Sequence, residues 1–238
     1  MEKAHVVIVR GLSEDVSWIH NIDYSFTLLS FSKEKRGQVG EFLPFYKWIY
    51  DNYDNLPEYL ILAHAHRNSW HCTVNIDELI NNLSFDHKFK NINIFSFNEE
   101  QTYFNSRQLD VDRSAHLPKD VEYVDYFSKF LEYKFNSFLE LFGIDWFPAE
   151  EVIGRKCGQC YVSRDLILSK SKDFWKKLIN FFYFVPIKLY EERPDIIQFF
   201  IDYERHSLEY PCSVLFEIIN HYIFTGIKDY RKIFSSGL

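Results

Sequence analysis

The chain has 238 residues, 47% of them hydrophobic and 19% aromatic, and this composition excludes a disordered or linker-rich protein. Its formal net charge of −7 at pH 7 argues against a nucleic-acid partner, because nucleic acids require a basic surface. With only 8 Gly and 7 Pro, the chain is expected to form one continuous domain over residues 1–238.

Short apolar segments in the first third of the chain predict three strands, at residues 6–9, 25–31 and 60–63. A run without polar alternation is typical of a strand that is covered on both faces. Residues 39–53 carry aromatic and aliphatic side chains at helical spacing and predict a helix. We therefore expect an α/β fold with a mixed, mostly parallel central sheet flanked by helices.

The segment after the first predicted strand has features of a nucleotide-binding site. In open α/β sheets, ligands bind just beyond the carboxyl ends of the strands. Arg10 ends the first strand, and Asp15 lies in an acidic, capped helix start of the kind that commonly holds a nucleotide's base and ribose. The glycines of a GxGxxG dinucleotide motif are absent. Asp15 as a simple helix cap is the alternative interpretation.

Histidines follow the third predicted strand. His64 and His66 are two residues apart and would point the same way if the strand continued, which suits a metal ion or a phosphate. Trp70 and His71 come next in the same segment. A His-rich surface loop is the alternative.

The rest of the chain predicts mainly helices. We expect helices at residues 74–83, 121–142, 174–184 and 214–224, and strands at residues 92–97 and 158–164. Residues 98–120 have no sustained apolar period and are expected to form a long loop that crosses near the site. Residues 205–213 predict a second polar loop before the last helix.

Glu217 is a candidate general base in that last helix. A carboxylate is costly in such an apolar segment unless it is paired or functional. Burial raises the pKa of a carboxyl group and suits it to accept a proton. A structural carboxylate paired with Arg164 or Arg205 is the alternative.

The cysteines are expected to be reduced and structural rather than metal ligands. Cys157 and Cys160 form a single CxxC, and no second pair supplies the further ligands of a zinc site, so we expect reduced, structural thiols. The first residues lack a secretory apolar stretch, and no window reaches the length of a membrane span. A cytoplasmic protein is therefore expected.

Five segments of the chain follow one another in an order that is informative: Val6-Val-Ile-Val9, Glu14-Asp-Val-Ser-Trp18, Ile49-Tyr-Asp-Asn-Tyr-Asp-Asn-Leu-Pro57, Tyr161-Val-Ser-Arg164 and Phe216-Glu217. In this order they resemble a family of small proteins from fungi, algae and large algal DNA viruses of the chlorovirus type. That family is similar to glycosyltransferases of the GT-A fold. The resemblance covers residues 6–72 and 157–226. Two motifs differ: Gln38-Val-Gly-Glu41 lacks the family's arginine, and His64-Ala-His66 replaces its Gln-Gly-His.

The resemblance implies a GT-A-like enzyme of glycan synthesis, in the host cytoplasm if the chain is viral. It would transfer a sugar from a nucleotide-sugar, such as UDP-xylose or a UDP-hexose, to a carbohydrate hydroxyl with inversion. In similar inverting enzymes, a glutamate that opens an aromatic helix is the catalytic base, which implies this role for Glu217. Glu209 and then Glu41 are the reserve candidates.

The resemblance also bears on cofactors. No Asp-x-Asp follows residues 60–63, so no metal is expected to be required, and basic residues would offset the diphosphate charge. These are Arg164, Arg205, Lys228, Arg231 and Lys232. His64 and His66 could instead hold Mn²⁺ or Mg²⁺.

The expected site has a donor end and an acceptor end. Donor binding is expected from Arg10, Asp15, His64, His66, Arg164 and Arg205, and binding of the glycan acceptor from Trp70, His71 and Glu41. Two other functions stay open: a metal-dependent hydrolase with His64, His66 and His71 as ligands, and a carbohydrate-binding module without turnover. The sugar, the acceptor and the oligomeric state are left open.

Overall fold

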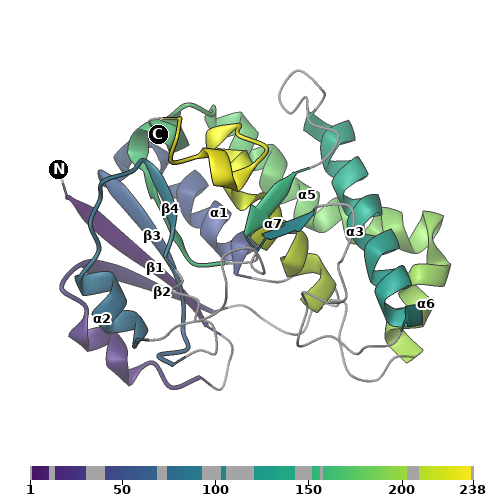
Figure 1. Ribbon diagram of the computed structural model, residues 1–238, viewed down its shortest axis with the longest axis horizontal. Helices are drawn as coiled ribbons and strands as arrows, with labels where there is room; N and C mark the ends of the chain where they lie inside the picture. Colours follow the sequence, from purple (N-terminus) through teal and green to yellow (C-terminus); the bar gives the residue numbers. More distant parts are fainter. Residues whose placement is uncertain are drawn as a thin grey trace.

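The apolar segments form a central sheet whose described strands follow the order β2-β1-β3-β7-β4 (Figure 1). The strands are β1 Ala4–Arg10, β2 Ser25–Ser30, β3 Tyr59–His64, β4 Phe89–Asn91 and β7 Cys160–Ser163. The computed structural model describes residues 2–10, 14–30, 41–68, 74–92, 103–105, 121–142, 152–155, 158–202 and 209–236. β1 pairs in parallel with β2 and β3, whereas β7 pairs antiparallel with β3 and β4. The expected mixed, mostly parallel sheet is confirmed, because β7 alone among these five strands runs in the opposite direction.

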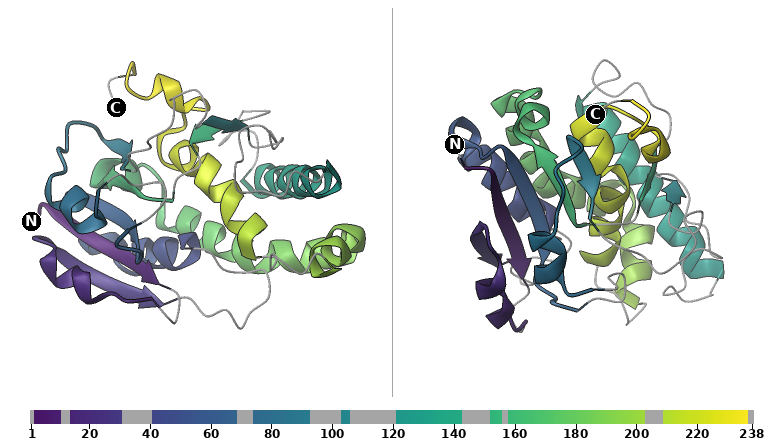
Figure 2. Two further views of the ribbon diagram at one scale, coloured as in Figure 1. Left: turned by 60° about the horizontal axis from the view of Figure 1, so that its bottom comes forward. Right: turned by 60° about the vertical axis from the view of Figure 1, so that its left-hand side comes forward.

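Helices cover both faces of this sheet (Figure 2). On one face lie α1 Phe42–Asp51, α3 Val121–Phe142, α5 Lys172–Glu192 and α7 Glu209–Thr225. The 3₁₀-helix η1 Ser17–Asn21 and α2 Ile76–Asn81 cover the other. In β1, Val7 and Val9 pack toward the first face, and Val6 and Ile8 toward the second. This two-sided burial explains why the strand has no polar alternation.

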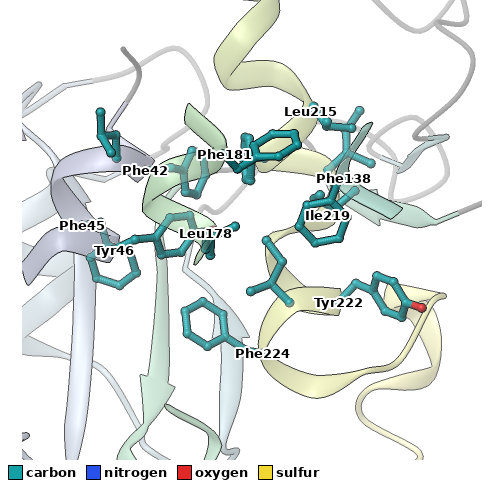
Figure 3. Packing of buried hydrophobic residues seen from close by; sticks show 14 of the residues in the cluster. Phe42, Phe45, Tyr46, Phe138, Leu178, Phe181, Leu215, Ile219, Tyr222 and Phe224 are labelled. Carbon is teal, nitrogen blue, oxygen red and sulfur yellow. The ribbon is translucent and has the colours of Figure 1, made fainter. Parts of the chain in front are cut away.

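Aromatic side chains fill the space between the sheet and the larger group of helices. Figure 3 shows side chains from α1, α3, α5 and α7 converging there, among them Phe45, Phe138, Phe181 and Phe224. Tyr46 lies within ring-contact distance of Trp175 and Phe224. The aromatic stripe that predicted the first helix is therefore core packing.

Smaller elements complete the described chain: η2 Tyr53–Asn55, β5 Tyr103–Asn105, β6 Ile153–Arg155, α4 Arg164–Leu168, α6 Pro194–Asp202 and η5 Tyr230–Lys232. β5 and β6 pair antiparallel in a separate two-stranded sheet. β6 packs closely on α7, since a Cβ on Gly154 would lie 1.7 Å from the carbonyl oxygen of Ile218. Only glycine lets the two backbones approach so closely.

Two expected loops differ from the structure, and one helix was not expected. The expected loop at 205–213 is wrong in its second half, because α7 already begins at Glu209; Pro211 is tolerated in a first turn, where its missing N–H has no helical partner. Part of the expected loop at 98–120 is β5, and α6 was not expected. The predicted strand at 92–97 lies almost wholly outside the described residues, and β4 precedes it.

Within the described chain, no helix combines the length and hydrophobicity that a membrane span requires.

Candidate functional site

Polar side chains gather at one edge of the sheet, where the parallel strands have their carboxyl ends. Arg10 ends β1, Ser30 ends β2 and His64 ends β3, while Gln159 directly precedes the oppositely directed β7. The buried Gln159 carboxamide oxygen accepts a hydrogen bond from the backbone N–H of His64 at 3.1 Å. This contact fixes the last residue of β3 against β7.

His64 forms an ion pair with Glu41. Nε2 of His64 lies 3.0 Å from Oε1 of Glu41, and the two side chains are only 19% and 15% exposed. Glu41 immediately precedes α1, so the start of this helix is held against the end of β3. Gly158 leaves room for the pair, because a Cβ there would lie 2.3 Å from Oε1 of Glu41 and 2.4 Å from Nε2 of His64.

Glu217 is close enough to act electrostatically on the same histidine. Burial lowers the pKa of His64, but the charge and hydrogen bond of Glu41, then the charges of Glu217 and Glu14, outweigh it, so the pKa lies above its ordinary value of 6.5. Glu217 itself is half-buried on α7. The structure thus brings together three of the predicted site residues: His64, Glu41 and Glu217.

A pocket of about 450 Å³ opens beside the end of β3. It is lined by Glu14, Asp15, Ser17, Trp18, Asn21, Ala65, His66, Arg67 and Asn68. Nε2 of His66 lies 3.0 Å from Oε1 of Glu14, so an ion pair links the segment after β1 to the segment after β3. The Arg67 guanidinium donates two hydrogen bonds to the buried Asp77 carboxylate, which also accepts one from Asn21.

Asp15 and Arg10 lie at this edge, each with an internal partner. Asp15 accepts hydrogen bonds from the backbone N–H of Ser17 at 2.9 Å and from its hydroxyl at 3.2 Å, and these bonds lower the pKa of the Asp15 carboxyl. Asp15 therefore binds Ser17, the first residue of η1, and lines the pocket at the same time, whereas the cap position of η1 is Val16. Arg10 donates a hydrogen bond to the hydroxyl of Ser30, at 3.3 Å, on the neighbouring strand β2.

Arg164 is not brought to this site. It follows β7, whose carboxyl end lies at the opposite edge of the sheet, and its backbone N–H bonds to the Glu58 carbonyl just before β3. The length of β3, six residues at about 3.3 Å each, separates this position from His64. Arg164 therefore lies apart from Arg10, Asp15 and His64, with which it was predicted to bind the donor. Arg205, Trp70 and His71 lie outside the described residues, as does the side chain of Glu209.

The two histidines that could hold a metal have separate carboxylate partners in the described chain. His64 and His66 bind different carboxylates, those of Glu41 and Glu14. The described residues hold no group of three or more His, Cys, Asp or Glu side chains suited to a metal ion.

Cys160 belongs to the packing beneath the site. Its thiol is buried on β7, burial raises its pKa to about 12, and Sγ accepts a hydrogen bond from Asn220 on α7. Cys157 lies outside the described residues. The strand after the CxxC was predicted and is β7.

Sequence reasoning gave no individual role to four residues that build this region: Glu14, Arg67, Gly158 and Gln159. Glu14 and Arg67 follow β1 and β3, so their place at the ends of strands was a usable signal. Gly158 and Gln159 precede a strand, and only the reversed direction of β7 brings them to the same edge.

The chain belongs to a family that is described as "Protein of unknown function (DUF3431)", since the model of that family matches residues 6–230. No curated protein and no solved structure matches the chain significantly.

Proposed function

We propose that this member of a family of unknown function is a glycosyltransferase, which moves a sugar from a nucleotide-sugar to a carbohydrate hydroxyl. The observation that carries the proposal is the 3.0 Å contact of Glu41 with His64, within electrostatic reach of Glu217 and beside an open polar pocket at the carboxyl edge of the sheet. Transfer to a hydroxyl needs a carboxylate that accepts a proton next to a binding site for a charged donor.

Glu217 is the proposed base. Its carboxylate takes the proton of the acceptor hydroxyl, whose oxygen attacks the anomeric carbon. The bond from that carbon to the diphosphate breaks, the diphosphate leaves with the electron pair, and the configuration inverts. The raised pKa of His64 favours its imidazolium form, which pairs with Glu41 and attracts the charge of Glu217.

The donor would occupy the pocket next to His66. Its volume of about 450 Å³ falls within the range of small-molecule sites. The carboxylates of Glu14 and Asp15 suit the hydroxyls of a ribose, and the guanidinium groups of Arg10 and Arg67 suit phosphate oxygens. We favour a UDP-sugar.

We infer that transfer needs no metal ion. The guanidinium groups of Arg10 and Arg67 are cations of the chain itself that would bind oxygens of the leaving diphosphate. We place the reaction in the cytoplasm, where a free thiol such as that of Cys160 stays reduced. EDTA should leave the rate unchanged; a loss of rate that Mn²⁺ restores would contradict the metal-free mechanism.

The test is a panel of nucleotide-sugars with mono- and oligosaccharide acceptors, read by melting temperature and by release of nucleoside diphosphate. A UDP-sugar should raise the melting temperature, because a ligand stabilises the state that binds it. Asp15→Asn should weaken this binding about tenfold, the loss expected when one hydrogen bond to a charged group is removed. Asp23→Asn, at an exposed carboxylate outside the pocket lining, is the matched control. If no nucleotide-sugar binds or turns over, the proposal fails.

A further inference from the structure

The outer face of α5 carries apolar side chains that no described element covers. Phe184, Ile187 and Tyr190 are 67%, 55% and 40% exposed, and their spacing of three residues places them along one side of the helix. Single exposed apolar residues are ordinary, but three in succession on one helix face form a patch that is typical of a contact surface.

Exposed residues of opposite charge lie at the two ends of this apolar stripe. Lys176 and Lys177 are exposed toward the start of α5, and Glu191 is exposed near its end. None of the three makes an ion pair with a described residue, in contrast to Lys188, which binds Glu140 of α3 at 2.8 Å. We define the α5 patch as Lys176, Lys177, Phe184, Ile187, Tyr190 and Glu191.

The order of charges makes the α5 patch complementary to itself. Phe184 lies seven residues from Lys177 and seven from Glu191, which is about 10 Å along the helix in each direction. If two copies of α5 pack antiparallel about a two-fold axis at Phe184, Lys177 of each copy faces Glu191 of the other. A parallel arrangement would instead place like charges together.

We propose that this chain forms a two-fold homodimer through the α5 patch. Phe184 and Ile187 of both copies form the apolar centre, and the two Lys177–Glu191 pairs form the polar rim, as in other isologous interfaces. The helix that carries the patch packs on α1, α3 and α6. One helix pair is a small interface, so the dissociation constant is expected on the order of 10 µM.

Sedimentation equilibrium of the full chain from about 1 to 200 µM tests this interface. Wild type should pass from monomer to dimer over this range, and Phe184→Glu should stay monomeric with an unchanged melting temperature, since the side chain is exposed. Leu168→Glu, at an exposed leucine of α4, is the matched control and should dimerise normally.

The charge pairs are tested by reversal. Lys177→Glu and Glu191→Lys should each weaken the dimer about tenfold, because each change makes both symmetry-related pairs repulsive. The double variant should return to within about twofold of wild type, because the pairs are restored in reverse. A wild type that stays monomeric up to about 200 µM overturns the proposal. So does a dimer that Phe184→Glu leaves intact, or a double variant as weak as the single ones.

Discussion

At the scale of single residues, Gly158 is needed for the contact between His64 and Glu41. Gly158→Ala would place a methyl group 2.3 Å from Glu41 and 2.4 Å from His64, and atoms cannot remain that close. The pair must separate, and His64 then loses the interactions that raise its pKa while burial continues to lower it.

We therefore predict that Gly158→Ala lowers the pKa of His64, as measured by NMR titration of the imidazole. The control is Gly226→Ala. This residue has a φ of 72°, so alanine there costs about 1 kcal/mol of stability through backbone strain, but no atom lies near its Cβ. His64 should titrate normally in this control. If the pKa of His64 is the same in Gly158→Ala as in wild type, a side chain at position 158 does not disrupt the contact between His64 and Glu41.

His221 makes the folded state sensitive to acid. Burial lowers the pKa of its ring to about 4, although a hydrogen bond to the Ile218 carbonyl and the charge of Asp229 act in the opposite direction. In the unfolded chain the pKa returns to about 6.5. Between these two values the unfolded chain binds a proton that the folded chain does not, so stability falls as the pH falls from 6.5 to 4.

The shift corresponds to about 3 kcal/mol of unfolding free energy. His221→Asn keeps a donor for the Ile218 carbonyl but cannot titrate. We predict that the stability of wild type relative to His221→Asn decreases by about this amount between pH 6.5 and pH 4, as measured by urea unfolding. Parallel stability curves for the two proteins would contradict the buried, neutral state of His221.

At the scale of elements, a buried hydrogen-bond chain holds α1, α7 and β7 together beneath the candidate site. The Tyr46 hydroxyl donates to Oδ1 of Asn220 at 2.8 Å, and the Asn220 amide donates to Sγ of Cys160 at 3.3 Å. α1 follows Glu41 and α7 carries Glu217. The two hydrogen bonds therefore fix the helices that position these carboxylates near His64.

Tyr46→Phe should destabilise the fold by about 1–3 kcal/mol, because the Asn220 oxygen would remain buried without a donor. Tyr53→Phe is the control: this half-buried tyrosine also loses one hydrogen bond, to the Lys170 carbonyl, but water can reach the site. Its cost should stay below about 1 kcal/mol. Chemical unfolding measures both values, and equal costs would argue against a tightly closed Tyr46–Asn220 contact.

The main elements could be predicted because their apolar pattern is local. β1 and β3 are buried on both faces and read as continuous apolar runs, and α3 shows its helical spacing over its full length. The start of α7 was missed because Pro211 favours a loop interpretation. The short strands β5 and β6 depend on pairing with each other, which no local pattern reveals.

At the scale of the whole molecule, strand direction decides which residues share a site. Arg164 and His64 both follow predicted strands, so sequence alone placed them together. Because β7 is antiparallel to β3, the structure puts Arg164 at one edge of the sheet and brings Gly158 and Gln159 to the other. The residues after β1 and β3 were predicted correctly to lie at one edge, because these strands are parallel neighbours. The contact of Glu41 with His64 depends on helix packing and could not be predicted.

The most direct test of the central claim is the kcat for transfer from a UDP-sugar by Glu217→Gln. The glutamine keeps the shape of the side chain but cannot accept a proton, so kcat should fall by about 10²–10⁴-fold while donor binding and the melting temperature stay near wild type. Asp51→Asn, at the exposed far end of α1, should leave kcat unchanged. A near-normal kcat in Glu217→Gln would contradict the proposed base and the mechanism built on it.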